Sequence, residues 1–386
     1  MDRDAENPKH DDGSVSKPMR VLFVLQDLQL GGIQKVTSTI AGALNSEEYD
    51  VSLLVTRYSK AVYSSKCHVY QSKLNLKNLI LDGTRHILKR IPWVSMETVS
   101  VNKLHQFLQK RSFDVIILNP EFFSETLKLK KFYPKTRILL WMHNNFDIYM
   151  YKYYAATKQE LCQAAISADG IICLERYTFS KWKKFNKNCY LIHNPMTIDE
   201  CNKHADLNSR KIAFVGRLEI EQKGLDYLLE IAKRIPDGWQ ISIAGSGKDE
   251  DKIKRMAKEQ ELLDKVDFRG ALYGDDLSNH YLTSSIMILP SRWEGFALVT
   301  VEAMSRGLPI VAFDIPSMRE ATDEGKFGLL AENGNIASFA MALNSFIQSF
   351  EKRMEYSSLS LKRSKDFRME SVLETWKNML IDINSR

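Results

Sequence analysis

Short apolar runs recur along the chain, and most are followed by a polar loop and then by a segment whose apolar residues have helical spacing. Such a run, bounded by polar residues, is typical of a strand buried in a parallel sheet. We predict strands at residues 20–25, 51–56, 114–118, 137–142, 170–174 and 190–192, and a second series at 211–215, 240–244, 266–268, 286–289 and 309–313. Two consecutive series of strand and helix predict an α/β protein with two domains.

The break between the two series lies at His193-Asn194-Pro195, where the periodic pattern stops. A chain of 386 residues is long enough for two domains that each bury a core. We predict a first domain at 19–195 and a second domain at 196–365. Residues 366–386 have apolar side chains at helical spacing and predict a terminal helix. Residues 1–18 are polar, mixed in charge and without the apolar core of a signal peptide, and we predict a disordered tail.

The composition is that of an ordinary soluble protein, with 44% hydrophobic and 26% charged residues. The apolar runs are far shorter than the roughly 20 residues that cross a bilayer. Five scattered cysteines without a Cys-x-x-Cys pair favour a reducing compartment and no zinc site. We therefore predict a cytoplasmic protein.

Positive charge is concentrated in the first half: residues 1–200 hold 28 Lys and Arg against 20 Asp and Glu. The stretch 60–111 and the segments 128–135 and 181–187 mix basic with apolar residues. Such stretches can lie on an anionic bilayer, which predicts docking on the inner membrane face near a lipid-carried acceptor; solvated helices over ordinary cores are the alternative. Nucleic-acid binding is not expected, because no recognised module or aromatic and basic platform is present.

The stretch 285–306 is the most informative part of the chain. It predicts a strand, a tight polar loop and a helix that ends at Arg306, with Glu294 in the loop and Glu302 in the helix. Backbone N–H groups near 296–299 would be helix-start donors suited to a diphosphate. Two carboxylates beside such a phosphate site suit the hydroxyls of a ribose and of a sugar. A surface helix also carries two such acids by chance, so the flanking features must decide.

The segment Glu294-Gly295-Phe296 with Glu302 eight positions after Glu294 resembles the Glu-x7-Glu signature of the retaining glycosyltransferases of family 4, also called glycosyl transferases group 1. The resemblance implies the GT-B fold, in which two Rossmann-like domains face each other across a cleft, and a terminal helix that packs back on the first domain. It also implies that Glu302 holds the ribose and Glu294 the transferred sugar. Further donor-binding residues in this motif would be Gly295, Phe296, Ala297 and Leu298.

Two more features of the first half fit this resemblance. Gly31 and Gly32 lie between a strand and a helix, where only glycine lets the main chain approach a phosphate closely, although a tight turn alone is the alternative. His143 follows a strand at the edge where ligands bind in open α/β sheets; a capping or core histidine is the alternative. In the family the glycine loop reaches the donor, and the histidine contacts the transferred sugar.

Arg217 and Lys223 follow the first strand of the second series, six residues apart around a turn. Arginine offers a planar fork for phosphate oxygens, and lysine adds a compact charge. The family places these two residue types on the donor's diphosphate, whereas ordinary surface charges are the alternative. We count Arg217 and Lys223 with Glu294 and His143 as the candidate catalytic residues.

Neither a cofactor nor a metal is expected. A nicotinamide fingerprint fails because its third glycine is replaced by Glu250, and the acidic residues 249–251 are explained as favourable charges in a helix's first turn.

The resemblance implies a metal-independent, hexosyltransferase-type enzyme. It would move a sugar from a nucleotide diphosphate sugar, here a UDP-sugar, to a hydroxyl of a lipid-linked or polymeric saccharide in surface polysaccharide biosynthesis. A nucleotide-sugar epimerase or phosphorylase of the same fold, or a non-catalytic partner subunit, are the alternatives. The sugar, the acceptor and the linkage stay open.

Overall fold

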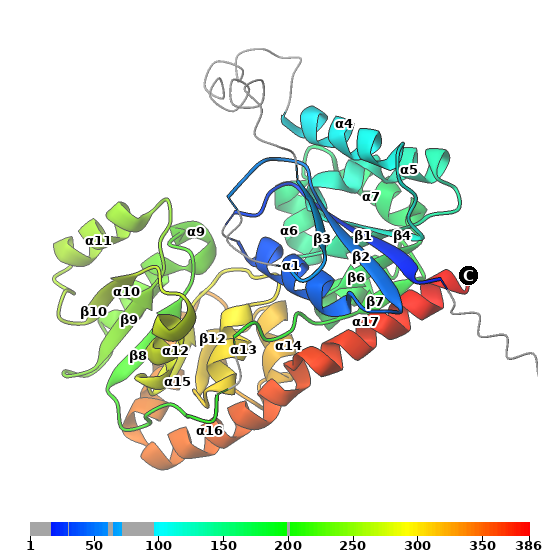
Figure 1. Ribbon diagram of the computed structural model, residues 1–386. Helices are drawn as coiled ribbons and strands as arrows, with labels where there is room; N and C mark the ends of the chain where they lie inside the picture. Colours follow the sequence, from blue (N-terminus) through cyan, green and yellow to red (C-terminus); the bar gives the residue numbers. More distant parts are fainter. Residues whose placement is uncertain (1–16, 30, 61–64, 72–95, 199–200) are drawn as a thin grey trace, which may run out of the picture.

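The computed structural model describes residues 17–29, 31–60, 65–71, 96–198 and 201–386. They form two α/β domains that lie side by side, each around its own parallel sheet (Figure 1). Most of the predicted N-terminal tail and residues 61–64 and 72–95 of the basic stretch lie outside the described residues. Lys73, Lys77, Arg85, Lys89, Arg90 and Trp93 are among them.

The first sheet pairs seven strands in parallel, in the order β3-β2-β1-β4-β5-β6-β7. Their bounds are Met19–Leu25 for β1, Tyr49–Val55 for β2, His68–Gln71 for β3, Val115–Leu118 for β4, Arg137–Met142 for β5, Gly170–Cys173 for β6 and Cys189–Leu191 for β7. The order changes direction between β1 and β4. Loops after these two strands therefore open a crevice at one edge of the sheet.

Helices cover both faces of this sheet. Neighbouring residues of a strand point to opposite faces, so Phe23 packs in one core with α1, whereas Leu22 and Val24 pack in the other with α4, α5 and α7. The helical segments are α1 (Gly32–Leu44), α4 (Met96–Leu108), the 3₁₀ segment Pro120–Glu125, α5 (Thr126–Phe132), α6 (Phe146–Ile148), the π-helical segment Tyr149–Tyr153, α7 (Lys158–Ser167) and α8 (Arg176–Trp182).

The second sheet has six parallel strands in the order β10-β9-β8-β11-β12-β13. They are β8 (Lys211–Val215), β9 (Gln240–Ala244), β10 (Val266–Gly270), β11 (Ile286–Leu289), β12 (Ile310–Phe313) and β13 (Leu329–Ala331). Its helices are α9 (Ile220–Lys223), α10 (Leu225–Ala232), α11 (Glu250–Glu259), α12 (Gly274–Leu282), α13 (Leu298–Ser305), α14 (Pro316–Thr322) and α15 (Ile336–Gln348). Again the direction of the order changes between two strands, β8 and β11, and the motif residues follow both.

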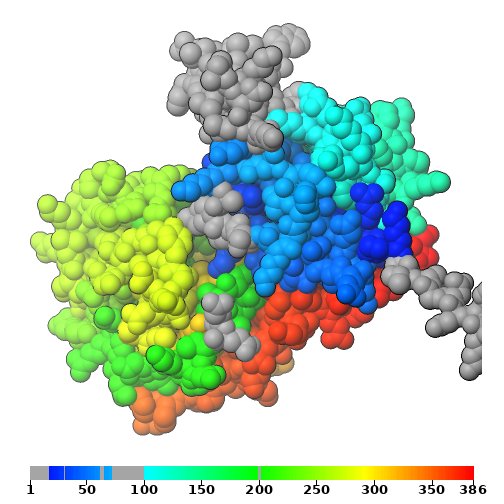
Figure 2. All heavy atoms as spheres, viewed as in Figure 1, coloured from blue at the N-terminus to red at the C-terminus, as the bar shows by residue number. Residues whose placement is uncertain are grey.

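The C-terminal helices connect the two domains. Helix α16 (Phe350–Ser364) packs on α13 of the second domain, and α17 (Met369–Asn384) returns to the first domain. There the Trp376 ring lies 5.7 Å from the Phe23 ring and 4.8 Å from the Trp141 ring, measured between centroids. Figure 1 and Figure 2 show this segment, coloured orange and red, lying along both domains. The arrangement fixes one domain against the other.

The predicted strands at 137–142, 211–215, 240–244 and 286–289 are confirmed to the residue, whereas β3 and β13 were not predicted. A short helix, α9, forms in the segment between Arg217 and Gly224, where we expected only a turn, and α10 follows it. Gly224 separates these helices with a φ of 62°, and a Cβ there would lie 2.0 Å from the Pro290 carbonyl oxygen. Only glycine fits this close approach.

Candidate functional site

A cavity of about 1060 Å³ lies between the two domains and is lined by residues of both. Parallel strands of each domain end at this cavity, which explains why loops far apart in sequence meet there. It is lined by every site residue predicted from the sequence: Gly31, Gly32, His143, Arg217, Lys223, Glu294, Gly295, Phe296, Ala297, Leu298 and Glu302.

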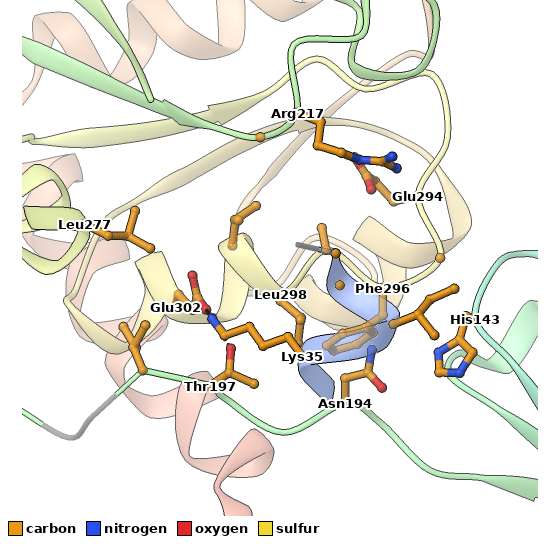
Figure 3. Close-up of a pocket in the computed structure, with 18 of the residues that line it drawn as sticks. Lys35, His143, Asn194, Thr197, Arg217, Leu277, Glu294, Phe296, Leu298 and Glu302 are labelled. Atoms are coloured by element: carbon orange, nitrogen blue, oxygen red, sulfur yellow. Dashed lines mark hydrogen bonds and ion pairs between the residues drawn. The ribbon is translucent and has the colours of Figure 1, made fainter. Parts of the chain in front are cut away.

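Glu302 lies in α13 and is only 1% exposed. Its Oε1 accepts hydrogen bonds from Lys35 Nζ at 2.9 Å and from Thr197 Oγ1 at 2.7 Å. Its Oε2 accepts a hydrogen bond from the Tyr281 hydroxyl at 3.1 Å. Figure 3 shows Lys35 and Thr197 pointing toward this carboxylate. One acid thus joins α1 of the first domain, the linker, and α12 and α13 of the second domain.

Glu294 lies in the loop between β11 and α13, where it is buried beside Lys223. Lys223 Nζ donates to Glu294 Oε1 at 2.6 Å, and Ser291 Oγ donates to the same oxygen at 2.6 Å. The lysine side chain is only 10% exposed, so Glu294 is its main electrostatic partner. The sequence did not show this pairing, which gives Glu294 a fixed position in the cavity wall.

Arg217 differs from Lys223 in its exposure. Its side chain is 61% exposed and has only long contacts, 3.6 Å to Glu219 Oε1 and 3.5 Å to Gln222 Oε1. Arg217 and Glu294 both line the cavity (Figure 3). The two cations predicted to act together on a diphosphate therefore have different surroundings: Arg217 is available to a ligand, and Lys223 is committed to Glu294.

Gly295 and Phe296 bring the two domains into contact. A Cβ on Gly295 would lie 1.7 Å from the His143 carbonyl oxygen, so the glycine permits the second domain to touch the end of β5. The Phe296 ring packs against the His193 and Phe367 rings, with centroid distances of 5.8 and 5.4 Å. The Phe296 side chain thus belongs to the core under the cleft, and only its backbone is left for a ligand.

The start of α13 differs in part from the prediction. The helix begins at Leu298, after Ala297, but the Leu298 N–H already donates to the Phe296 carbonyl at 2.9 Å and the Thr300 N–H to the Ala297 carbonyl at 2.9 Å. A tight turn at the helix start uses these two donors. The expectation of unpaired N–H groups through this segment is therefore wrong for Leu298, one of the predicted donor-binding residues.

His143 follows β5 and is held in a defined tautomer. Asn119 donates its Nδ2 to the Val24 carbonyl at 2.8 Å, which turns its Oδ1 toward His143 Nε2 at 2.5 Å. Nε2 must then carry the proton, and Nδ1 is left as an acceptor. Burial lowers the pKa of His143 to about 3, so the ring is neutral at physiological pH.

Gly31 and Gly32 lie at the amino end of α1, as predicted. Gly31 precedes the helix in an extended conformation, with φ at −178°, and Gly32 is its first residue. A Cβ on Gly32 would meet no atom within 4 Å, so its surroundings in the protein do not require glycine. Space for a ligand beside the backbone is consistent with the predicted role of this loop.

Several functional residues were missed by sequence reasoning: Lys35, Thr197, Tyr281, Ser291 and Asn119. They contact the predicted acids and His143 from segments that carry no motif of their own. Lys35 alone had a usable signal, because it lies in the first turn of the helix that follows the glycine loop.

Within the described ranges, no group of three or more His, Cys, Asp or Glu side chains is placed to hold a metal ion. Over the same part of the chain, no helix combines the length and the apolar character needed to span a bilayer.

Comparison with known proteins gives a consistent result. The family described as Glycosyl transferases group 1 matches residues 199–362. An uncharacterised glycosyltransferase of Haemophilus influenzae is 30% identical over 367 residues, which are 93% of this chain and 98% of the relative. The amylovoran biosynthesis glycosyltransferase AmsD of Erwinia amylovora is 23% identical over 369 residues, which cover 91% of this chain and 96% of AmsD.

Among solved structures, a variant of TarM from S. aureus, crystallised with Fondaparinux, α-GlcNAc-glycerol and UDP, has a TM-score of 0.72. It is 15% identical, and the match covers 94% of this chain and 99% of TarM. At this identity the likeness concerns the fold, and it confirms the expected GT-B architecture of two Rossmann-like domains.

Proposed function

The chain belongs to the glycosyl transferases group 1, and from this premise we propose that it moves a sugar from a UDP-sugar to a hydroxyl of a saccharide acceptor, keeping the anomeric configuration. The main support for the proposal is that one cavity is lined together by Arg217, Lys223, Glu294, Glu302 and His143. The complex of TarM with UDP supports the choice of nucleotide. The name of AmsD, an amylovoran biosynthesis glycosyltransferase, supports a role in polysaccharide biosynthesis.

In the proposed reaction the bond between the anomeric carbon and the diphosphate oxygen breaks, and its electron pair stays on the diphosphate. The acceptor oxygen forms the new bond to that carbon. Arg217 lies exposed in the cavity and stabilises the negative charge that develops on the diphosphate, which requires no metal. The proton of the acceptor hydroxyl goes to the departing phosphate oxygen.

The two acids hold the hydroxyl groups of the donor. Glu302 accepts hydrogen bonds from the ribose hydroxyls. Among the described contacts, its Oε2 accepts one hydrogen bond, from the Tyr281 hydroxyl, so it can accept another. Glu294, fixed by Lys223 and Ser291, accepts from the transferred sugar and places negative potential beside the developing cation. His143 adds an acceptor at Nδ1 for a sugar hydroxyl.

The first experiment is a thermal-shift screen of nucleotide sugars in the presence of EDTA, because a ligand that binds the native state raises the melting temperature. The donor found is then used in steady-state kinetics. Glu302→Ala is expected to raise the donor KM, and Arg217→Ala to lower kcat. Glu259→Ala, at an exposed position of α11, is the matched control and should change neither.

Product analysis separates the proposed reaction from the alternatives. A transferase gives slow donor hydrolysis without acceptor and a glycoside with it, whereas an epimerase converts the donor with no acceptor at all. A non-catalytic partner subunit would give neither product. Unchanged kinetics in both active-site variants would remove the residue assignment.

The proposal includes docking of the first domain on an anionic membrane. Helix α5 exposes Leu127 and Phe132, the latter by 64%, and exposed Lys128, Lys131 and Lys135 lie beside them in sequence. This alternation of apolar and basic side chains suits the headgroup region of a bilayer. Wild-type protein should pellet with vesicles of phosphatidylglycerol at low salt, and a Phe132→Ser, Lys131→Glu variant should not. Failure of the wild type to pellet would count against docking.

A further inference from the structure

Glu121 is an acid in the cavity wall that neither the motifs nor the proposed donor site use. It lies in the 3₁₀ segment Pro120–Glu125, directly after β4, and it lines the cavity. Strand β4 lies between β1 and β5 in the sheet. Glu121 is therefore on the same edge as the glycine loop after β1 and His143 after β5.

One oxygen of this carboxyl group has no partner. Oε2 of Glu121 is buried and forms no hydrogen bond in the described structure. Burial raises the pKa of Glu121, and the nearby Asp27 carboxylate raises it further, while a hydrogen bond from its own backbone N–H opposes both effects. An unpartnered buried acceptor is rare in folded proteins, and a ligand that donates a hydrogen bond would complete it.

The first-domain wall around Glu121 offers no available positive charge among the described residues that line it. Lys35 is the one basic side chain of this wall in the described residues, and it donates to Glu302 at 2.9 Å. His143 is neutral, because burial lowers its pKa to about 3. An anionic group placed here would face the Glu121 carboxylate without a compensating cation.

The same wall presents aromatic rings and amide groups. Tyr149 and Tyr153 lie in the π-helical segment that follows His143. The His143 backbone N–H donates to the Tyr149 hydroxyl at 2.9 Å, and Asn144 Nδ2 lies 3.4 Å from the Tyr153 hydroxyl. The Tyr153 side chain is 52% exposed, so its ring is accessible. Aromatic faces combined with carboxylate and amide groups suit the apolar faces and hydroxyl edges of a sugar ring.

Glu121 and the residues proposed to hold the diphosphate come from different domains. Arg217, Lys223 and Glu294 belong to the second domain, whereas Glu121 belongs to the first, and all four line the cavity. A sugar held by Arg217, Lys223 and Glu294 lies between the two walls. In the proposed reaction the attacking hydroxyl gives its proton to the departing phosphate oxygen, so it lies beside the diphosphate. The rest of the acceptor is left to contact the wall formed by the loops after β4 and β5.

We propose that Glu121 accepts a hydrogen bond from a hydroxyl of the acceptor, and that the part of the acceptor bound in the cavity is an uncharged saccharide ring rather than a phosphate or a uronic acid. The inference rests on the proposed function and adds the class of acceptor. Glu121 is in this assignment an acceptor-binding residue that determines specificity against anionic acceptors.

The test compares donor hydrolysis with transfer to a defined panel. The panel consists of octyl glucoside, octyl galactoside, octyl glucuronide and glycerol 3-phosphate, each offered with the UDP-sugar that gives the largest thermal shift. Wild-type enzyme is expected to transfer to at least one neutral glycoside at least tenfold faster than to either anion. Glu121→Gln should slow that transfer at least tenfold and leave donor hydrolysis within twofold. Glu160→Gln, at an exposed position of α7, is the matched control.

A charge reversal gives an independent result. Glu121→Lys should shift the preference at least tenfold toward octyl glucuronide, an effect that a general loss of structure does not produce. Three results would each overturn the inference. The wild type prefers the anions, the wild type hydrolyses the donor but transfers to no member of the panel, or Glu121→Gln leaves the ratio of transfer to hydrolysis unchanged. Absence of both donor binding and donor hydrolysis would instead count against the proposed function.

Discussion

Lys35 Nζ lies 2.9 Å from Glu302 Oε1, although the two residues are 267 positions apart in sequence. The lysine is in the first domain and the acid in the second, so the ion pair crosses the cleft. Glu302 is almost fully buried, whereas the lysine side chain is 26% exposed. The Glu302 carboxylate therefore takes part both in the contact between the domains and in the proposed ribose site.

Removal of this lysine should loosen the two domains. In Lys35→Met the Glu302 carboxylate stays buried with two neutral donors, and leaving a buried charged group less well paired costs about 1–3 kcal/mol. We expect a lower melting temperature and, in small-angle X-ray scattering without donor, a larger radius of gyration.

The control is Lys233→Met, which removes a lysine from a more exposed pair with Glu230 in the second domain. It should change neither quantity, because exposed pairs contribute little. Identical scattering of Lys35→Met and wild type would show that the pair does not hold the domains together.

Replacement of Arg217 and replacement of Lys223 should have different effects on kcat and on thermal stability. Arg217→Ala removes an exposed side chain, so stability should be retained while kcat falls about 100- to 1000-fold through loss of leaving-group stabilisation. Lys223→Met should lower both kcat and the melting temperature, because Glu294 then stays buried without its cation. Donor kinetics and thermal unfolding measured on both variants check the distinction.

Arg234→Ala, at an exposed position after α10, is the control for loss of a basic residue. It should behave as wild type in both measurements. A large loss of stability in Arg217→Ala would contradict the assignment of that side chain to the ligand.

Gly295→Ala should open the cleft. The added Cβ would lie 1.7 Å from the His143 carbonyl oxygen, and both groups are fixed in backbone, so the domains must move apart. We expect a larger radius of gyration and reduced transfer. In Gly32→Ala the new Cβ meets nothing within 4 Å, and the scattering and melting temperature should be those of the wild type. Full activity in Gly295→Ala would exclude the close approach.

Because His143 is buried and neutral, we predict that the free energy of unfolding falls in acid. Its pKa is lowered from 6.5 to about 3, so between these values the unfolded chain binds more protons than the folded protein. The free energy of unfolding therefore falls as pH drops below 6.5, and at pH 5 this one residue accounts for about 2 kcal/mol.

Urea denaturation at pH 7 and pH 5 measures this effect. In His143→Gln, which does not titrate, the difference between the two pH values should be smaller than in the wild type. His204 is exposed in the segment before β8, and His204→Gln should leave the difference unchanged. An equal difference in His143→Gln and wild type would show that His143 is not held neutral by burial.

The apolar runs were sufficient to predict most of the fold. The run at residues 137–142 predicted a buried strand correctly, because both faces of a parallel sheet are covered and its strands are therefore apolar throughout. The short strands β3 and β13 escaped prediction since their runs are brief and only partly buried. The short helix α9 was also not predicted, because the segment before Gly224 indicated only a turn, and the close approach of Gly224 to Pro290 involves another loop.

The apolar runs alone predicted the two α/β domains, because parallel strands buried on both faces need such runs. The site residues were identified through the resemblance to the glycosyl transferases group 1, and the topology explains why their loops meet at one edge of each sheet. Only the tertiary structure decided how those residues are paired: Lys35 with Glu302, Lys223 with Glu294, and Asn119 with His143. Glu121 likewise acquired its unpartnered oxygen only through the packing around it. Hydrogen bonds between distant segments depend on how the two domains are held by α17 and Phe296, and a local pattern of apolar and polar residues does not encode that placement.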